Sequence, residues 1–179
     1  MNNNSYMSRI KKRILIGLTI FIGISAFLYY QLHHGKDEVY LLPNGFTGIV
    51  YIYSSEQGAK KEFEGTWLDK VRVYRIPNNG VLLTQFEPSE RFRKVSYFYV
   101  DSQGNRTELQ SPYTQNRKGF ILKPKTHVAS IYRESVLDEN DNPLIYDSFL
   151  VGTDKQITIF HEERKKVNIL QLIDENLKK

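Results

Sequence analysis

A run of 19 residues without a charged side chain, residues 14–32, constrains the fold of this chain more than any other feature. It reads ILIGLTIFIGISAFLYYQL. As an α-helix, such a run is long enough to cross about 30 Å of hydrocarbon, and a helix satisfies its own backbone hydrogen bonds in lipid. Tyr29 and Tyr30 lie near its C-terminal end, where aromatic rings favour the membrane interface. The run therefore predicts a single transmembrane helix.

Four cations and no acid precede this run. They are Arg9, Lys11, Lys12 and Arg13. Because positively charged flanks stay in the cytoplasm, they predict a topology with the N-terminus inside the cell and the C-terminal domain outside. The predicted parts are a cytoplasmic segment (1–13), a transmembrane helix (14–32), a stalk (33–38) and an extracellular domain (39–179). The predicted location is the cell membrane, and the lipid bilayer is the expected partner of the helix.

A cleaved signal peptide and a buried core helix are the alternative interpretations of residues 14–32. A signal peptide usually has an apolar stretch of about 7–15 residues and a small-x-small cleavage site after it. The run is longer, and Ile24-Ser25-Ala26, the nearest match to such a site, lies inside it. A buried core helix would normally have one polar face. These features favour an uncleaved anchor.

The rest of the chain is nearly neutral and has no cysteine. Removing the four leading cations from 25 leaves 21 Lys and Arg against 20 Asp and Glu over residues 36–179. A nucleic-acid-binding protein needs clustered cations to neutralise phosphates, so we expect no nucleic-acid partner. The lack of cysteine excludes disulfides and thiolate metal sites. It also fits, together with the richness in Lys, Ile, Asn and Tyr, an exported protein of a Gram-positive bacterium.

Short apolar and aromatic runs separated by turn residues predict strands from residue 39 onwards. Pro77-Asn78-Asn79-Gly80 predicts a hairpin turn between strands at 71–76 and 81–86. Further strands are predicted at 40–42, 48–53, 95–100, 106–109, 126–136 and 144–151, with a short apolar piece at 120–122. Residues 54–70 are charged and aperiodic, which predicts a long exposed loop.

The C-terminal part is predicted to be helical over about residues 154–177, as one or two helices. Thr153 and Gln156 have the spacing of a capping box. Four apolar residues at three- and four-residue steps define the expected buried face: Val167, Leu170, Ile173 and Leu177. The β-branched residues 157–159 leave a final strand open as the alternative for residues 155–160.

These elements predict a mainly β fold. Strands come first and a helix comes last, which favours an antiparallel β-sandwich or barrel-like domain with a C-terminal helix over alternating βαβ units. With the anchor included, the expected architecture is an N-terminal transmembrane helix followed by that domain.

Residues that could bind metal are few. Asp138, Asn140, Asp141 and Asn142, together with Glu139, form the densest group of oxygen ligands. They lack the spacing of an EF-hand loop, and Asp and Asn are common in turns, so a plain turn is the favoured interpretation. His33 and His34 are adjacent, which defines no coordination geometry. We therefore predict no metal and no cofactor.

No linear motif identifies an enzyme. The chain has no G-x-S-x-G, no phosphate-binding loop and no G-x-G-x-x-G. His127 and His161 are not close in sequence to a nucleophile and an acid that would complete a catalytic set. We predict no catalytic residue, although a catalytic site can lack a linear signature.

Aromatic residues are unusually frequent, with 12 Tyr and 10 Phe. Aromatic side chains pack well on sheets, so we assign those in strand-like runs to the core: Tyr40, Tyr51, Tyr53, Tyr74, Tyr97, Phe98 and Tyr99. Trp67 lies in the predicted loop of residues 54–70, where it is a candidate contact residue for a partner.

Four segments resemble an uncharacterised domain-of-unknown-function family of Bacillus-type exported proteins. They are YLLPNGFTGIV (40–50), VYRIPNNGVLLTQ (73–85), YFYVD (97–101) and FLVGT (149–153). Some members of that family are anchored by a lipid-modified Cys, which this chain lacks. The resemblance implies a location in the cell envelope and carries no catalytic residue.

The sequence thus favours a membrane-anchored extracytoplasmic binding or structural module, with a cell-envelope protein or polymer as its partner. An envelope hydrolase and an accessory subunit of a membrane complex are the alternatives. A pocket with paired carboxylates or a perturbed His would favour the hydrolase.

Overall fold

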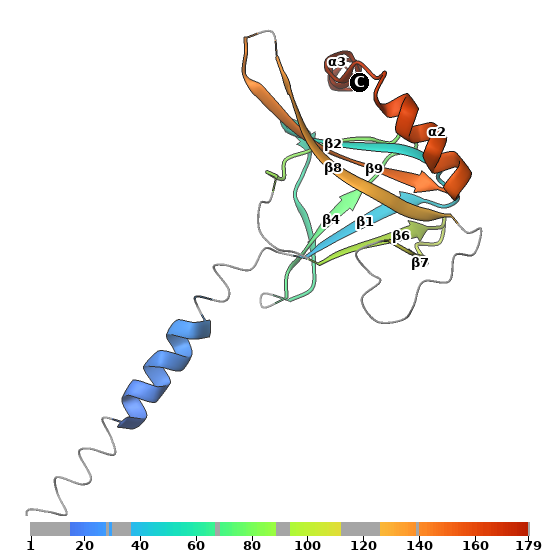
Figure 1. Cartoon of the computed structure of the whole chain (residues 1–179). Helices are drawn as coiled ribbons and strands as arrows, with labels where there is room; N and C mark the ends of the chain where they lie inside the picture. Colours follow the sequence, from blue (N-terminus) through green and yellow to red (C-terminus); the bar gives the residue numbers. More distant parts are fainter. Residues whose placement is uncertain are drawn as a thin grey trace, which may run out of the picture. The chain divides into compact units, whose positions relative to one another are not determined.

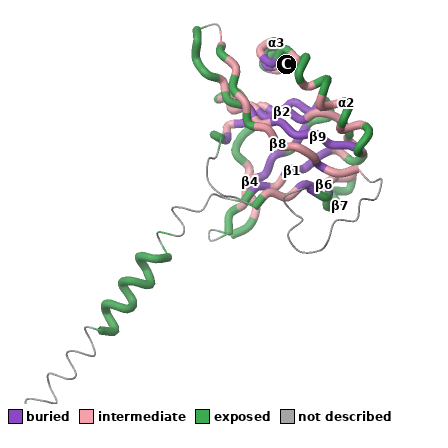
Figure 2. Tube along the Cα trace, in the orientation of Figure 1, coloured by how far each residue is buried: buried purple, intermediate pink, exposed green. Residues whose placement is uncertain are grey.

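The computed structural model describes residues 15–27, 29, 37–66, 69–88, 94–111, 126–138 and 140–178 (Figure 1). The chain divides into two compact units, residues 1–35 and 36–179. In the first unit, residues 15–27 form a helix whose residues are all exposed (Figure 2). Among the described residues, no helix combines the length and the apolar character needed to cross a membrane. The four cations of the predicted topology lie outside the described residues: Arg9, Lys11, Lys12 and Arg13.

The second unit contains a five-stranded sheet, which we name sheet A. Its order is β3 (Glu62–Glu64), β4 (Val71–Arg75), β1 (Glu38–Pro43), β6 (Val95–Val100) and β7 (Arg106–Leu109). The central strand β1 pairs in parallel with both β4 and β6, whereas β3 and β7 add antiparallel edges. Sheet A is therefore a mixed sheet.

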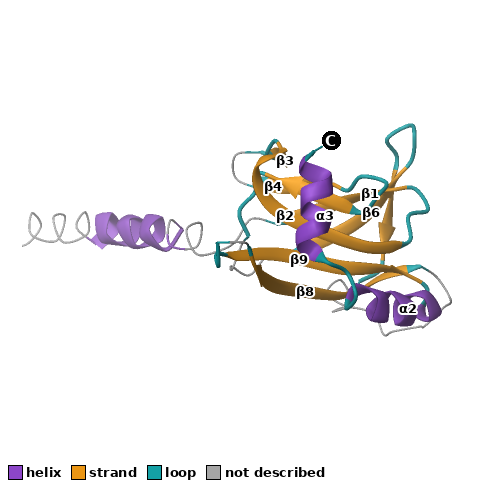
Figure 3. Cartoon of the chain, turned by 90° about the horizontal axis from the view of Figure 1, so that it is seen from above, coloured by secondary structure: helices purple, strands orange, loops and turns teal. Residues whose placement is uncertain are grey.

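The other sheet, sheet B, has four strands and is covered by the C-terminal helices. Its order is β5 (Val81–Thr84), β2 (Gly48–Ala59), β9 (Pro143–Gly152) and β8 (His127–Leu137). Here β2 and β5 are parallel, and the other pairs are antiparallel. Helices α2 (Asp154–Arg164) and α3 (Ile169–Leu177) pack on this sheet, and α3 crosses its strands (Figure 3).

The larger core fills the space between the sheets, and its residues come from the inward-facing positions of both. It consists of Tyr40, Leu42, Val50, Ile52, Tyr74, Ile76, Leu82, Phe86, Tyr97, Leu109, Val128, Phe149 and Val151. A second core lies between sheet B and the helices, and it contains Tyr51, Val81, Tyr146, Ile169 and Ile173. Sheet B is thus buried on both faces, and the most deeply buried strand segments follow β1, β2 and β9 (Figure 2).

The prediction of a mainly β fold with a C-terminal helical part is confirmed, but the purely antiparallel arrangement is wrong. Both sheets are mixed, and they are not closed into a barrel. The parallel pairs join strands that are distant in sequence, and strand-like runs carry no information on which of them become neighbours.

The predicted hairpin between residues 71–76 and 81–86 is also wrong. The turn exists, since Gly80 N donates to Pro77 O at 2.9 Å, but it carries the chain from sheet A to sheet B. On one side, Ile76 N donates to Leu41 O of β1 at 2.8 Å. On the other, Tyr51 N of β2 donates to Gly80 O at 2.9 Å. Each arm therefore pairs with another strand, and the arms do not pair with each other.

Two predicted hairpins are confirmed, and their turns share one geometry. In the β6–β7 turn, Asp101 Oδ1 accepts from the backbone N of Gln103 and Asn105, each at 2.9 Å. In the β8–β9 turn, Asp138 Oδ1 accepts from the backbone N of Asn140 and Asn142, each at 2.8 Å. An Asp at the first position and an Asn four residues later close both turns.

The predicted loop of residues 54–70 is largely strand. β2 extends to Ala59, and β3 follows at Glu62–Glu64. The polar end of β2 is held because Gln85 donates from its backbone N to Ala59 O and from its side chain to Glu56 O, both at 3.0 Å. These residues are polar because they lie at the rim of the sandwich. Trp67 lies outside the described residues.

The C-terminal part forms two helices, so the alternative of a final strand at residues 155–160 is wrong. Thr153 caps α2, and Gln156 Oε1 accepts from Thr153 N at 2.9 Å as the predicted capping box requires. The buried face of α3 is shifted from the prediction, since Ile169 and Ile173 are its buried residues and Leu177 is exposed. The reason is that Asn168 caps α3, so Val167 precedes the helix and does not share its face.

We predict that Gly80→Ala destabilises the protein much more than Gly45→Ala. Both glycines have positive φ, 76° and 75°, so an alanine at either position costs about 1–2 kcal/mol of backbone strain. Only at Gly80 would the new Cβ also lie 2.5 Å from Ile49 O, whereas nothing lies within 4 Å at Gly45. Urea unfolding should therefore show a loss of roughly 3 kcal/mol or more for Gly80→Ala. Equal losses for the two variants would contradict the close approach of the turn to β2.

Candidate functional site

A small pocket opens at one end of the space between the two sheets. Sheet A contributes Glu38 and Tyr74, and sheet B contributes Ser54, Thr84 and Asp147. The segment after β5 adds its wall. The pocket holds about 290 Å³ of space continuous with solvent. It is thus the place where polar side chains of both sheets meet beside the main core.

Glu38 is the most unusual residue of the pocket, because it is a carboxylate that is only 1% exposed. It begins β1 between two parallel neighbours, where its backbone N donates to Lys94 O at 2.8 Å. Its side chain accepts hydrogen bonds from Tyr40 Oη at 2.7 Å and Tyr74 Oη at 3.1 Å. Arg72 Nη1 lies 3.8 Å from Glu38 Oε1. A buried carboxylate needs such partners, since an unpaired buried charge is strongly destabilising.

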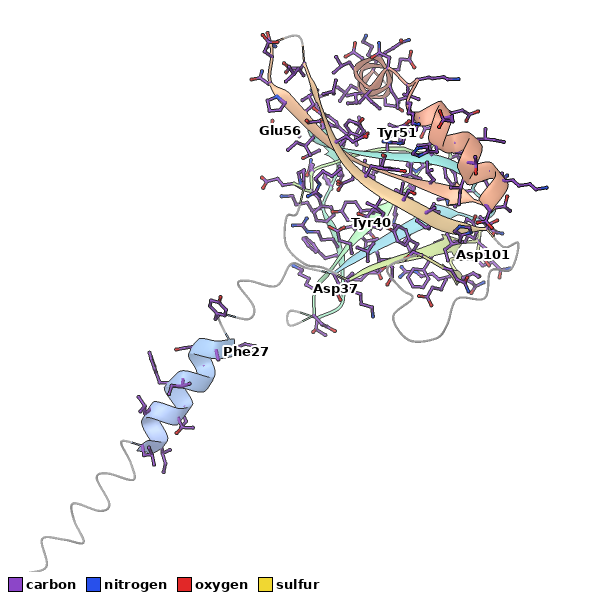
Figure 4. All side chains as sticks on the ribbon, viewed as in Figure 1. Phe27, Asp37, Tyr40, Tyr51, Glu56 and Asp101 are labelled. Carbon is purple, nitrogen blue, oxygen red and sulfur yellow. The ribbon has the colours of Figure 1, made fainter. Side chains whose placement is uncertain are left out.

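The rings below Glu38 form a stack across sheet A. The ring centroids of Tyr40 and Tyr74 are 4.7 Å apart, and those of Tyr40 and Tyr97 are 5.1 Å apart, with the rings nearly parallel. Tyr40 lies between the sheets, while Tyr51 lies on the opposite side of sheet B (Figure 4). Burial and the nearby Glu38 carboxylate raise the pKa of Tyr74, so its hydroxyl stays protonated and donates. The stack fixes both tyrosine donors of Glu38.

Asp147 of β9 is the second acid of the pocket, and it too is paired. Arg133 of the neighbouring strand β8 donates to it through Nε at 2.8 Å and through Nη2 at 2.9 Å. This forked geometry matches a guanidinium to both carboxylate oxygens. The pocket therefore contains two acid–guanidinium pairs, one from each sheet.

A hydroxyl-bearing and apolar wall faces these pairs. Thr84 is 4% exposed, and its Oγ1 accepts from Phe86 N at 3.2 Å. The Phe86 ring packs against Tyr74 at 5.0 Å, and the Arg72 guanidinium lies 5.2 Å from its centroid. With Ile52 and Pro88, Phe86 supplies the apolar surface of the pocket. The site combines balanced charges, hydroxyl groups and an aromatic surface, which is the composition of a binding pocket.

A second polar cluster lies on the outer face of sheet B, below α2. Arg164 Nη1 donates to Glu134 Oε2 at 2.5 Å, and its guanidinium carbon lies 3.7 Å from the Tyr132 ring centroid. Tyr146 Oη donates to the same Glu134 oxygen at 2.7 Å. Although burial opposes its ionisation, these hydrogen bonds from Arg164 and Tyr146 hold the pKa of Glu134 below its ordinary value. The cluster fastens the last turn of α2 to β8 and β9.

This second cluster contains buried polar atoms without a hydrogen-bond partner. Across the described ranges there are three such side-chain atoms, Tyr51 Oη, Ser148 Oγ and Arg164 Nε. Tyr51 and Tyr132 are both paired directly with Ser148 in the sheet, so the three atoms belong to one row. Burial raises the pKa of Tyr51 to about 12, an effect that Arg164 opposes and Glu134 reinforces. The layer below the helices is thus closed but incompletely hydrogen-bonded.

The histidines do not form a catalytic or metal site where the structure describes them. His127 Nε2 lies 3.5 Å from Asp154 Oδ1, and His161 Nδ1 lies 2.9 Å from Tyr132 Oη. His33 and His34 lie outside the described residues. Within the described ranges, no group of three or more Asp, Glu or His side chains could hold a metal ion.

The acidic turn after β8 has a structural explanation. Backbone hydrogen bonds from Asn142 and Asn140 hold the pKa of Asp138 below its ordinary value, because they stabilise the ionised carboxylate. The plain-turn interpretation of this segment is confirmed, although Glu139 lies outside the described residues.

Sequence reasoning missed the pocket, although one signal for its central residue was available. Glu38 shares the strand parity of Tyr40 and Leu42 in Glu-Val-Tyr-Leu-Leu, so a strand there places its carboxylate on the buried face. Asp147 had no such signal, because its role depends on which strands become neighbours. The aromatic assignment is mostly confirmed, since four of the seven are buried: Tyr40, Tyr51, Tyr74 and Tyr97. Tyr53, Phe98 and Tyr99 are half-buried.

Three comparisons with known proteins place the chain. A family model described as a family of unknown function, DUF6843, matches residues 34–160. None of the curated proteins matches the chain. A solved structure from Bacillus anthracis, described provisionally as a lipoprotein, is similar with 16% identity and a TM-score of 0.48. The similarity covers 78% of this chain and 95% of that one.

We predict that Tyr51→Phe leaves the protein as stable as the wild type or more stable by up to about 1 kcal/mol, because it removes a buried hydroxyl that has no partner. Tyr146→Phe is the matched control, since its hydroxyl donates to Glu134 and its loss should cost about 1 kcal/mol. Urea unfolding of both variants measures the difference. If the two variants lose the same stability, Tyr51 Oη must have a partner in solution.

A second prediction concerns acid. Because the folded-state pKa of Glu134 is lowered, its ionised form stabilises the fold fully above the unfolded-state pKa of about 4.3, and this contribution is lost as pH falls through the folded-state pKa. The difference in unfolding temperature between wild type and Glu134→Gln should therefore be constant near neutral pH and shrink on acidification. Other carboxylates also titrate, so the difference between the two proteins is the quantity to measure. A difference that grows toward low pH would contradict this assignment.

Proposed function

Since the chain belongs to the DUF6843 family, whose function is unknown, we propose its role from its own residues: it is a membrane-anchored, extracytoplasmic binding module. Its globular unit uses the pocket between the two sheets to hold a component of the cell envelope. The family resemblance seen in the sequence is confirmed at the level of a domain of unknown function.

The apolar surface of the helix at residues 15–27 supports the anchor. Eight of its large apolar side chains are between 49% and 68% exposed: Leu15, Ile16, Leu18, Ile20, Phe21, Ile22, Ile24 and Phe27. Soluble proteins rarely leave a continuous apolar surface of this kind in water. The uncharged run continues to residue 32, and the four cations precede it. Lipid is the environment that suits such a segment, and the cations favour a cytoplasmic N-terminus.

The pocket around Glu38 is the observation that carries the binding role. A carboxylate that is 1% exposed contributes less to stability than a well-packed apolar residue of similar size would, because burying the charge is expensive. At this position it faces a pocket open to solvent, together with Asp147 and the hydroxyl of Thr84. Polar groups held rigidly by packing and hydrogen bonds are suited to bind a ligand without reorganisation.

The predicted topology can be tested in a Gram-positive host, which has no outer membrane to exclude protease. Full-length protein expressed there should sediment with membranes, and protease added to intact cells should digest residues 36–179. Replacing Arg9, Lys11, Lys12 and Arg13 with glutamate removes the charge bias and should sharply reduce the protease-sensitive fraction. A tail that stays protected in the unmodified protein would contradict the extracytoplasmic location.

The binding role predicts that blocking the pocket abolishes retention of envelope material. Ser54→Arg places a long charged side chain in the pocket, and Ser55→Arg, on the opposite face of β2, is the matched control. Purified full-length protein should sediment with isolated cell-envelope fragments, and only Ser54→Arg should lose this, with an unchanged unfolding temperature. Undiminished sedimentation of Ser54→Arg would show that the pocket is not the binding site.

A further inference from the structure

The charges of the pocket are already balanced, which restricts the ligand. Glu38 lies beside Arg72, with Oε1 and Nη1 3.8 Å apart. Asp147 and Arg133 share two hydrogen bonds of 2.8 and 2.9 Å. An ammonium ligand would find each carboxylate already next to a guanidinium, and a phosphate would find each guanidinium already next to a carboxylate. Either ion would lose its hydration without a free counter-charge in return.

The same groups keep hydrogen-bonding capacity for a neutral ligand. Each oxygen of an ionised carboxylate can accept two hydrogen bonds, and Glu38 Oε2 has a single printed donor, Tyr40 Oη. Thr84 Oγ1 accepts from Phe86 N, which leaves its own proton to donate. Ser54 adds a second aliphatic hydroxyl. The pocket therefore presents both acceptors and donors within a small space, which suits a ligand whose groups are themselves hydroxyls.

An apolar surface accompanies these polar groups. Phe86, Ile52 and Pro88 line the same pocket, and the Phe86 ring is held by Tyr74 at 5.0 Å and Phe63 at 5.3 Å. A sugar ring has C–H faces that pack on such a surface and an edge of hydroxyls that hydrogen-bond. The 290 Å³ volume includes open solvent, so the pocket accommodates one ring and leaves neighbouring units of a longer chain outside.

We infer that this pocket recognises a neutral, hydroxyl-rich ligand, namely a single uncharged sugar unit of a carbohydrate. The inference deepens the proposed binding function and depends on it. Neutral charge distinguishes this ligand class from amino sugars and sugar phosphates, which have the same ring and differ in one charged group.

Matched sugars test the inference directly. Full-length protein, kept in a detergent without a sugar headgroup, is titrated with glucose, galactose, mannose and N-acetylglucosamine, and with glucosamine and glucose 6-phosphate, by saturation-transfer NMR. At least one neutral sugar should bind, and its charged analogue should bind about tenfold more weakly or not at all. Binding of glucosamine or glucose 6-phosphate that is tighter than that of every neutral sugar would overturn the inference, and so would the failure of all four neutral sugars to bind.

Side-chain variants locate the site. Ser54→Ala and Thr84→Val each remove one hydroxyl from the pocket, and each should weaken sugar binding about fivefold, equivalent to about 1 kcal/mol. Ser55→Ala is the control, because the same change one residue later faces away from the pocket. Thr84 is buried, so its variant is compared only if its unfolding temperature is retained, and Ser54→Ala decides otherwise. Unchanged affinity in Ser54→Ala would overturn the assignment of the sugar to this pocket.

The ligand class and the proposed function can fail separately. If Ser54→Arg abolishes sedimentation with envelope fragments but no neutral sugar binds, the pocket is a binding site and the sugar assignment is wrong. If Ser54→Arg leaves sedimentation unchanged, the proposed function of the pocket is wrong whatever the sugars do.

Discussion

Tyr40 is where the packing of the sandwich and the chemistry of the pocket meet. Its ring lies between those of Tyr74 and Tyr97, at 4.7 and 5.1 Å, and Phe149 of sheet B meets it edge-on at 5.4 Å. Its hydroxyl donates to the buried Glu38 at 2.7 Å. Aromatic contacts of these kinds contribute about 0.5–1.5 kcal/mol each beyond the area they bury. The central position of β1 is therefore tied to the position of the Glu38 carboxylate.

This arrangement depends on the parallel pairing of β1 with both neighbours. The register places Tyr40 directly opposite Tyr74 and Tyr97, so the three rings share one row and one face of sheet A. A slip of one residue would move the tyrosines of one strand to the other face. It would break the stack and leave Glu38 with fewer donors. The ring stack and the carboxylate thus reinforce the same register, which agrees with the principle that local and global preferences coincide in stable folds.

Local chemistry explains which parts of the fold were predictable. The β6–β7 and β8–β9 hairpins and the capping box at Thr153 are encoded within a few residues, since Asp101, Asp138 and Gln156 satisfy nearby backbone groups. The exchange of sheets at Gly80 is not encoded locally. The same four-residue turn closes a hairpin or joins two layers, and the choice depends on whether β1 and β2 offer free edges to its two arms.

The candidate site follows the same division. The position of Glu38 on the buried face is a matter of strand parity and was available in the sequence. The pocket itself was not, because β1, β5 and β9 come together only through pairings that span much of the chain. The balance of its charges is also a tertiary property, since Arg133 reaches Asp147 across an antiparallel pair and Arg72 reaches Glu38 across a parallel one. A chain that is nearly neutral beyond residue 36 could have left these acids unpaired. Pairing each acid with a guanidinium removes the attraction for ions and keeps the hydrogen bonds, and this makes the pocket selective by charge without being charged itself.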